Sequence, residues 1–321
     1  MFLGVDGGQT GTRGVLVSAD GTVLATAEAG GLLDAVAPGG VERMRDVLTV
    51  IRDKCAGPGT PKGVFLGLTA TVPGTPSQKL GEDVAVELWP DSVTRVEGDS
   101  IVAWAAGTGG NPGVTAMAGT GSVVAAVNEA GETIECGGWG FTFGDWGSGF
   151  HMGATAVRRM VQRWDRDHGA SPMGAAIIEA MKVREASEIP PLFYAATIDI
   201  ADVARIAEIV SRFANSGDAE AQSIVAECGA TFADDVVNAI ARLHWVANPV
   251  PVAMVGRAFG AGGAYVTAFQ AAVRARSPLP VVFNDAVLST LGGAAMLALG
   301  LGGVKPSSEL VARLASQGLG A

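Results

Sequence analysis

The first part of the chain alternates short apolar runs with turns of small residues. Residues 2–5 and 14–17 predict two strands. The Asp-Gly pair within 18–21 predicts a hairpin turn that leads into a third strand at 22–27. The same order of strand, Gly/Thr turn, strand, polar turn and strand recurs over 114–138. This recurrence indicates a duplicated fold whose second copy begins near residue 114.

The rest of the pattern mixes buried strands with amphipathic helices. Along 41–55 the apolar residues fall on one helical face. The other expected strands are 63–69, 92–100, 251–260 and 280–285; the other expected helices are 75–88, 101–107, 151–166 and 306–317, and the stretch 170–250 is mostly helical. The run 288–303 is apolar but too short and too rich in glycine to span a membrane, so it predicts a buried helix.

Composition and charge narrow the class of protein. A chain of 321 residues favours two domains, and 48% hydrophobic residues allow a large core. The net charge of -10 argues against a nucleic-acid-binding surface, and no membrane partner is expected. The three cysteines, Cys55, Cys136 and Cys228, show neither metal nor disulfide spacing. With no signal-peptide pattern at the N-terminus, these features predict a cytoplasmic protein.

Two Gly/Thr turns, "DGGQTGT" (6–12) and "AGTGS" (118–122), carry the first chemical signal. A turn of small residues between two strands presents several backbone N–H groups in one direction, which can hold a phosphate. The expected phosphate-binding residues are Gly7, Gly8, Gln9, Thr10, Gly11 and Thr12 in the first turn, and Gly119, Thr120, Gly121 and Ser122 in the second. Ordinary tight hairpins stay open as an alternative, but the equivalent placement of the two turns favours a clamp around one nucleotide.

Three acidic residues are candidates for catalysis and binding. Asp6 ends the first strand, where a carboxylate can hold Mg²⁺ through waters. Asp99, between a strand and a helix, suits a general base that accepts a proton from an attacking hydroxyl. Position alone does not separate that role from the commoner one of a helix N-cap. Asp145 lies in the glycine- and aromatic-rich segment 135–153, where it can bind sugar hydroxyls.

The aromatic and glycine residues of two later segments leave further alternatives open. Trp139 can cover a sugar face, whereas Phe141, Phe143 and Phe150 also fit a buried aromatic plug. The run 254–263 follows a buried strand and suits an adenosine pocket, or else a closely packed strand-to-helix turn.

Taken in order, "VDGGQTGT", "EGDS", "AGTGS", "CGGWG…GDWGSG" and "VGRAFGAGG" resemble the BadF/BadG/BcrA/BcrD-type ATPase family, and within it the N-acetylglucosamine kinases. The resemblance implies an α/β fold of two ribonuclease-H-like, actin-like ATPase domains around a central cleft. The implied domains are 1–113, joined by the returning helix 304–321, and 114–303. The implied site residues are Asp6 for magnesium, Asp99 as base, Gly138, Trp139, Gly140 and Asp145 for the sugar, and Gly256, Arg257 and Gly260, within the motif 256–263, for adenosine.

Three departures from the family pattern concern the sugar. Trp146 replaces the Glu of "GDEGS", the loop 29–40 lacks the usual Asn, and the loop 67–74 differs. Asp34 is a candidate substitute for that Asn, and an additional carboxylate suits a free amine as in glucosamine. The departures leave the use of ATP untouched.

The resemblance therefore predicts an ATP- and Mg²⁺-dependent kinase for N-acetylglucosamine or glucosamine, acting at a primary hydroxyl. Its partners are the sugar and ATP, and the family's frequent dimers make a homodimer one expected assembly. Two alternatives stay open. One is an ATP-hydrolysing activator that passes an electron through an iron–sulfur cluster, which needs closely placed cysteines. The other is a nucleotide-switch protein without a sugar substrate.

Overall fold

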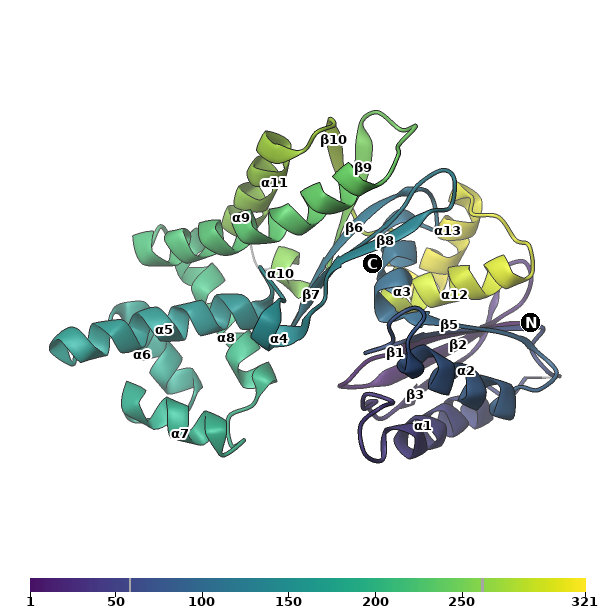
Figure 1. Ribbon diagram of the computed structural model, residues 1–321, viewed down its shortest axis with the longest axis horizontal. Helices are drawn as coiled ribbons and strands as arrows, with labels where there is room; N and C mark the ends of the chain where they lie inside the picture. The colour runs from purple at the N-terminus through teal and green to yellow at the C-terminus, as the bar shows by residue number, and fades with distance from the viewer. Residues whose placement is uncertain (58, 261–262) are drawn as a thin grey trace. The chain divides into compact units, whose positions relative to one another are not determined.

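The computed structural model describes residues 1–57, 59–260 and 263–321. The chain forms two compact units (Figure 1). The first unit contains Met1–Thr115 and Asn284–Ala321, and the second contains Ala116–Phe283. The expected boundary after residue 113 lies close to the observed one. The segment that returns to the first unit, however, begins at Asn284 rather than at residue 304.

The first unit is built on a five-stranded mixed sheet. Its strands are β1 (Phe2–Gly7), β2 (Thr12–Val17), β3 (Val23–Ala29), β4 (Gly63–Leu68) and β5 (Val93–Gly98), in the order β3-β2-β1-β4-β5. β2 is antiparallel to β1 and β3, whereas β1, β4 and β5 run parallel to one another. Crossovers from β1 to β4 and from β4 to β5 place helices on the sheet faces.

Helices cover both faces of this sheet (Figure 1). They are α1 (Gly40–Lys54), α2 (Pro76–Leu88), α3 (Asp99–Thr108), α12 (Thr290–Leu301) and α13 (Ser308–Leu314), followed by the turn η2 (Ala315–Leu319). On β1, Leu3 and Val5 join the core under α1 and α2. Gly4 faces α12, where a Cβ would lie only 2.4 Å from the backbone of Ala294. This close packing of α12 on β1 explains why the returning segment includes the helix predicted at 288–303.

The second unit repeats the strand order of the first. Its strands are β6 (Gly113–Ala118), β7 (Ser122–Val127), β8 (Thr133–Gly137), β9 (Val250–Val255) and β10 (Val281–Asp285), in the order β10-β9-β6-β7-β8. Replacing each label by its counterpart in the first sheet gives the same arrangement, so the two units are copies of one fold. The predicted α/β class is confirmed.

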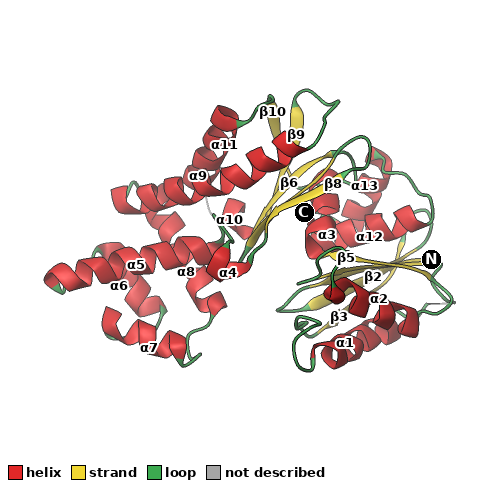
Figure 2. Cartoon of the chain, in the orientation of Figure 1, coloured by secondary structure: helices red, strands yellow, loops and turns green. Residues whose placement is uncertain are grey.

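Most of the second unit's remaining chain is helical (Figure 2). The helices are α4 (Gly140–Phe143), α5 (Gly149–Asp167), α6 (Pro172–Ala180), η1 (Ala186–Glu188), α7 (Ile189–Tyr194), α8 (Ile200–Asn215), α9 (Ala219–Arg242), α10 (Arg257–Gly260) and α11 (Gly263–Arg276). The strand predicted at 251–260 ends at Val255, because Gly256 has a left-handed backbone (φ 105°) and a helix follows. None of the helices in the described ranges combines the length and hydropathy that a membrane span requires.

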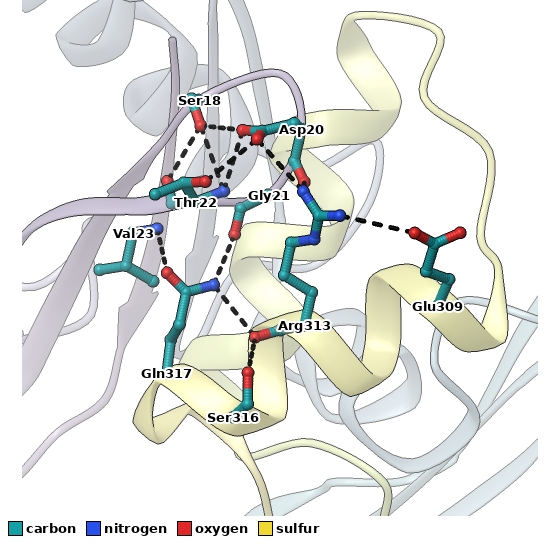
Figure 3. A network of polar contacts seen from close by, with 9 residues as sticks. All are labelled: Ser18, Asp20, Gly21, Thr22, Val23, Glu309, Arg313, Ser316 and Gln317. Atoms are coloured by element: carbon teal, nitrogen blue, oxygen red, sulfur yellow. Dashed lines mark hydrogen bonds and ion pairs between the residues drawn. The ribbon is translucent and has the colours of Figure 1, made fainter.

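The C-terminal turn is tied to the first hairpin by a polar network (Figure 3). The Gln317 side chain accepts a hydrogen bond from the Val23 amide at 2.8 Å and donates to the carbonyls of Gly21 and Arg313, each at 3.0 Å. The Arg313 guanidinium donates to the Asp20 carboxylate at 3.2 Å. These contacts hold two segments together that lie almost the whole chain apart.

Replacing Gln317 with Ala is expected to lower the free energy of unfolding by about 1–3 kcal/mol, because three backbone groups lose their partner at once. Ser316→Ala is the matched control, since Ser316 makes a single exposed bond to the Arg313 carbonyl and should change stability by about 0.5 kcal/mol or less. Urea unfolding of both variants checks this. Equal stabilities would show that the network carries no net stabilisation.

Candidate functional site

The first Gly/Thr turn, residues 8–11, joins β1 to β2 and leaves its central amides open. The Gly8 amide donates to the Gly11 carbonyl at 3.0 Å, which closes the turn. Gly31 packs beneath it, since a Cβ there would lie 1.9 Å from the Gln9 carbonyl oxygen. Within the described residues, the amides of Gln9, Thr10 and Gly11 have no hydrogen-bond acceptor. An exposed turn with three unpaired amides can accept an anion.

Thr12 and Asp34 differ from what the sequence predicts. Thr12 is fully buried on β2, and its Oγ1 has no partner among the described residues. Its hydroxyl is therefore inside the sheet rather than displayed with the turn. Asp34 lies exposed in the loop before α1, where its carboxylate accepts a hydrogen bond from the Val36 amide at 3.0 Å. That bond shapes the loop locally and uses one of the carboxylate oxygens.

Asp6, at the end of β1, is held by two side chains that the sequence analysis did not identify. Its Oδ2 accepts hydrogen bonds from Arg13 Nη2 at 2.7 Å and from Thr290 Oγ1 at 2.5 Å. Arg13 lies directly opposite Asp6 in the register of β1 and β2. The predicted pairing of these two strands could therefore have identified Arg13 as a neighbour of Asp6. Thr290 begins α12, and no local pattern connects it to Asp6. Within the described residues, Oδ1 of Asp6 makes no hydrogen bond.

Asp99 lies at the same sheet edge as Asp6. Strand register aligns Gly7 of β1 with Leu68 of β4, and Leu68 with Gly98 of β5. Asp6 precedes this row by one residue and Asp99 follows it by one, so two strand spacings, about 10 Å, separate their strands. The helix N-cap is Gly98 rather than Asp99, which occupies the first turn of α3.

The second Gly/Thr turn, residues 119–121, joins β6 to β7 at the place equivalent to the first and is one residue shorter. The Gly119 amide donates to the Gly121 carbonyl at 2.8 Å. The first amides of α5, those of Gly149 and Phe150, donate to the carbonyls of Gly119 and Thr120 at 2.8 and 3.1 Å. Within the described residues, the amides of Thr120 and Gly121 have no acceptor. The carbonyls of Gly119 and Thr120 are thus hydrogen-bonded to α5, whereas the amides of Thr120 and Gly121 stay available to a ligand.

Asp145 lies against this second turn. Its Oδ1 accepts a hydrogen bond from the Ser122 amide at 3.3 Å, and a Cβ at Gly121 would lie 2.8 Å from its Oδ2. Burial raises the pKa of the Asp145 carboxyl, and the bond from Ser122 opposes that rise. The next residue, Trp146, accepts a bond from the Ser122 hydroxyl at 2.7 Å. The second turn and the loop that carries Asp145 are separate motifs in the sequence, but in the structure they are in direct contact.

The aromatic residues of the same loop point mostly to solvent. Trp139 is 74% exposed and Phe143 is 80% exposed, so neither belongs to a buried plug. Phe150 is buried, and Phe141 packs edge-on against it with ring centroids 5.0 Å apart. The buried-plug alternative therefore holds for Phe150 alone. Trp139 is flanked by Gly138 and Gly140, whose φ angles of 72° and 76° favour glycine.

The third glycine segment adjoins the second turn. A Cβ on Gly256 would lie 2.4 Å from the Ala118 carbonyl oxygen, so the ends of β9 and β6 are in contact. Arg257 and Gly260 follow as exposed residues of α10, and positions 261–262 of the expected adenosine motif lie outside the described residues. A cavity of about 80 Å³ opens here; it is lined by Gly119, Thr120, Gly149, Ala201, Ala204, Arg205, Ala207, Glu208, Arg257 and Ala258.

The contribution of α8 to this cavity was missed from the sequence. Its alanines read there only as an amphipathic face. Their small side chains leave space beside the turn, and Arg205 and Glu208 add charge at its rim. In the described ranges, no three His, Cys, Asp or Glu side chains come together to form a metal site.

A partly buried carboxyl next to Gly137 belongs to Asp235 of α9. Its Oδ2 has no partner in the part of the chain that is described, and a Cβ on Gly137 would lie 2.7 Å from it. Burial, and secondarily the charge of Asp234, raises the pKa of Asp235 to about 6. The folded state therefore favours the protonated acid. The resulting stability is present below the unfolded value of 3.8 and is lost as the pH rises through about 6.

Asp235→Asn is therefore expected to raise the melting temperature at pH 8, because Asn stays neutral where the wild-type carboxyl must ionise. The gain corresponds to about 1 kcal/mol, less than the full shift gives, since solvent reaches part of the side chain. It should shrink steadily below pH 6. The exposed Asp91→Asn serves as control in the same thermal scans. A gain that does not depend on pH would contradict the assignment.

The duplicated ribonuclease-H-like unit, with a Gly/Thr turn after the first strand of each copy, defines a fold of the actin-like ATPase class. A family model, BadF/BadG/BcrA/BcrD ATPase family, matches residues 3–298, and the chain belongs to that family. The resemblance noted from the motifs is confirmed.

Two curated relatives are similar over part of their length. An N-acetylmuramic acid/N-acetylglucosamine kinase of Clostridium acetobutylicum is 24% identical over 159 residues, which are 50% of this chain and 52% of the relative. An N-acetyl-D-glucosamine kinase of Dictyostelium discoideum is 27% identical over 201 residues, 59% of this chain and 63% of the relative. The matches thus span about half to three fifths of the curated relatives.

Solved structures match over nearly the whole chain. A proposed N-acetylglucosamine kinase from Chromobacterium violaceum is 25% identical with a TM-score of 0.69, covering 92% of this chain and 98% of its own. A ROK family glucokinase from Streptomyces griseus, in complex with glucose and AMPPNP, is 16% identical with a TM-score of 0.55, covering 94% and 97%. The second match supports the fold alone.

Proposed function

We propose that this protein is an ATP-dependent kinase that phosphorylates an amino sugar, N-acetylglucosamine or glucosamine, at a primary hydroxyl. The observation that carries the proposal is the pair of Gly/Thr turns with unpaired amides at equivalent places in a duplicated fold. Unpaired backbone amides bind phosphate oxygens without the reorganisation that water requires. The names of the relatives support the sugar class.

The residues at the first turn fit a magnesium ion that arrives with the nucleotide. Oδ1 of Asp6 makes no hydrogen bond to a described residue, and a carboxylate oxygen is a ligand that Mg²⁺ accepts directly or through water. When bound, Mg²⁺ neutralises charge on the transferring phosphate.

Asp99 is the proposed general base. As the sugar hydroxyl oxygen bonds to the γ-phosphorus, the bond from that phosphorus to ADP breaks and the hydroxyl proton passes to Asp99. Two observations support this role: Asp99 shares a sheet edge with Asp6, and it lies in the first turn of α3. Its separation from β1 leaves room for both a phosphoryl group and an acceptor.

The remaining contacts divide between the sugar and the nucleotide base. Gly138, Trp139, Gly140, Asp145 and Asp34 are the proposed sugar contacts. Gly256, Arg257 and Gly260, with the α8 side of the cavity, are proposed for adenosine. The electron-transferring alternative gains no support from the three cysteines, which are buried and far apart in the sequence.

An ADP-release assay tests the proposal directly. The acceptors are N-acetylglucosamine, glucosamine, N-acetylmuramic acid, N-acetylmannosamine and glucose. We expect the highest kcat/KM with N-acetylglucosamine or glucosamine. The proposed sugar contacts include the carboxylates of Asp34 and Asp145, which can bind both an amide and an amine. Mass spectrometry of the product identifies the phosphorylated hydroxyl. If no acceptor raises the rate of ADP release above the rate measured without a sugar, a sugar kinase would be excluded.

A further inference from the structure

The contacts of Thr290 reach Asp6 from the other end of the chain. Thr290 Oγ1 accepts a hydrogen bond from Arg13 Nη2 at 2.8 Å. The Thr290 hydroxyl therefore donates its single proton in a hydrogen bond to Asp6 Oδ2, 2.5 Å away. The three side chains thus form a closed set of contacts, because Arg13 also donates to Asp6 Oδ2. The hydroxyl orientation is settled by its neighbours, and so is the oxygen of Asp6 that it binds.

The backbone that carries Thr290 is also firmly placed. Ser289 is the N-cap of α12 and accepts a hydrogen bond from the Gly292 amide at 3.2 Å, which makes Thr290 the first helical residue. α12 lies so close to β1 that a Cβ on Gly4 would overlap the Ala294 backbone. A helix in backbone contact with the strand that ends in Asp6 holds the hydroxyl at a fixed distance from the carboxylate.

We propose that Thr290 is a positioning residue for Asp6, fixing Oδ2 so that Oδ1 faces the magnesium ion of a bound magnesium–nucleotide. The inference rests on the proposed role of Asp6. Side chains that hydrogen-bond the far oxygen of a metal-binding carboxylate commonly set its orientation, and their loss costs 10–100-fold in metal affinity. Arg13 shares the contact and balances the carboxylate charge, so the cluster attracts little free cation before a nucleotide arrives.

The test measures ADP binding by calorimetry with and without Mg²⁺, which needs no turnover. In Thr290→Val the volume and the branched Cβ stay while the hydroxyl is lost. We expect the gain in ADP affinity that Mg²⁺ brings to fall about tenfold, with affinity for ADP alone unchanged. Thr290→Ser, which restores a hydroxyl, should recover that gain to within about threefold. Thr290→Ala repeats the loss with a side chain that fits without strain.

Asp6→Asn separates failure of this inference from failure of the proposed function. If Asp6→Asn loses the Mg²⁺-dependent gain and Thr290→Val keeps it, the positioning role is wrong and the role of Asp6 survives. If Asp6→Asn keeps the gain as well, both are wrong. In the double variant, Thr290→Val should add no further loss, because its effect passes through the Asp6 carboxylate. An additional loss in the double variant would likewise overturn the inference.

Discussion

Asp99→Asn is expected to lower kcat by two or more orders of magnitude, while the affinity for ADP changes by less than about threefold. Asn keeps the size of the side chain but cannot accept the proton of the sugar hydroxyl. The proposed nucleotide contacts lie on the two turns and at Gly256, Arg257 and Gly260, and none of them is Asp99. The loss should therefore appear in kcat and leave nucleotide binding intact, as expected for a group that acts on the reacting hydroxyl.

The matched control for Asp99→Asn is Glu97→Gln on the same strand. Glu97 lies two residues earlier on β5, and its carboxylate is paired with Arg95 at 2.8 Å. That variant removes a nearby negative charge without removing the proposed base, so kcat should stay within about threefold of wild type. Steady-state kinetics of both variants with the best acceptor decide the matter. A kcat of Asp99→Asn within tenfold of the wild-type value would contradict the assignment of Asp99 as the base.

Gly121→Ala is expected to raise the KM for ATP and the Kd for ADP about tenfold or more. The new Cβ lies 2.8 Å from Asp145 Oδ2, and Asp145 cannot withdraw without losing its bond from the Ser122 amide. Either Asp145 or the turn must therefore shift, and in both cases the contact between Asp145 and the turn no longer holds the amides of Thr120 and Gly121 in place. Losing one hydrogen bond to a charged phosphate oxygen costs about 1.5–3 kcal/mol, which corresponds to this change in affinity.

Gly300→Ala is the control for the same chemical change. Nothing lies within 4 Å of a Cβ at Gly300, near the end of α12, and Ala favours a helix. Its nucleotide affinity should equal that of the wild type, and its stability should be equal or slightly higher. Calorimetric titration with ADP compares the two variants. If Gly121→Ala binds ADP as tightly as Gly300→Ala, the second turn does not hold the phosphates.

Local features of the site followed from the sequence. The order of apolar runs and small-residue turns predicted both three-stranded hairpins, and β1 pairs antiparallel with β2 in the structure. The motifs also identified the family, which the family match confirms. The two turns, the segment 135–153 and Asp99 were identified as candidate site residues from the sequence alone, and their roles stay predictions. What the sequence could not supply was their surroundings.

The sequence by itself determined the duplicated hairpins and the small-residue turns, because strand periodicity and the need for glycine depend on residues a few positions apart. Only the tertiary structure decided that Thr290 binds Asp6, that Asp145 lies against the second turn and that α8 lines the cavity. The first of these contacts joins residues 284 positions apart in the sequence, and the second joins residues 23 positions apart. They depend on how closely α12 packs on β1 and α8 on α5, which no local pattern encodes.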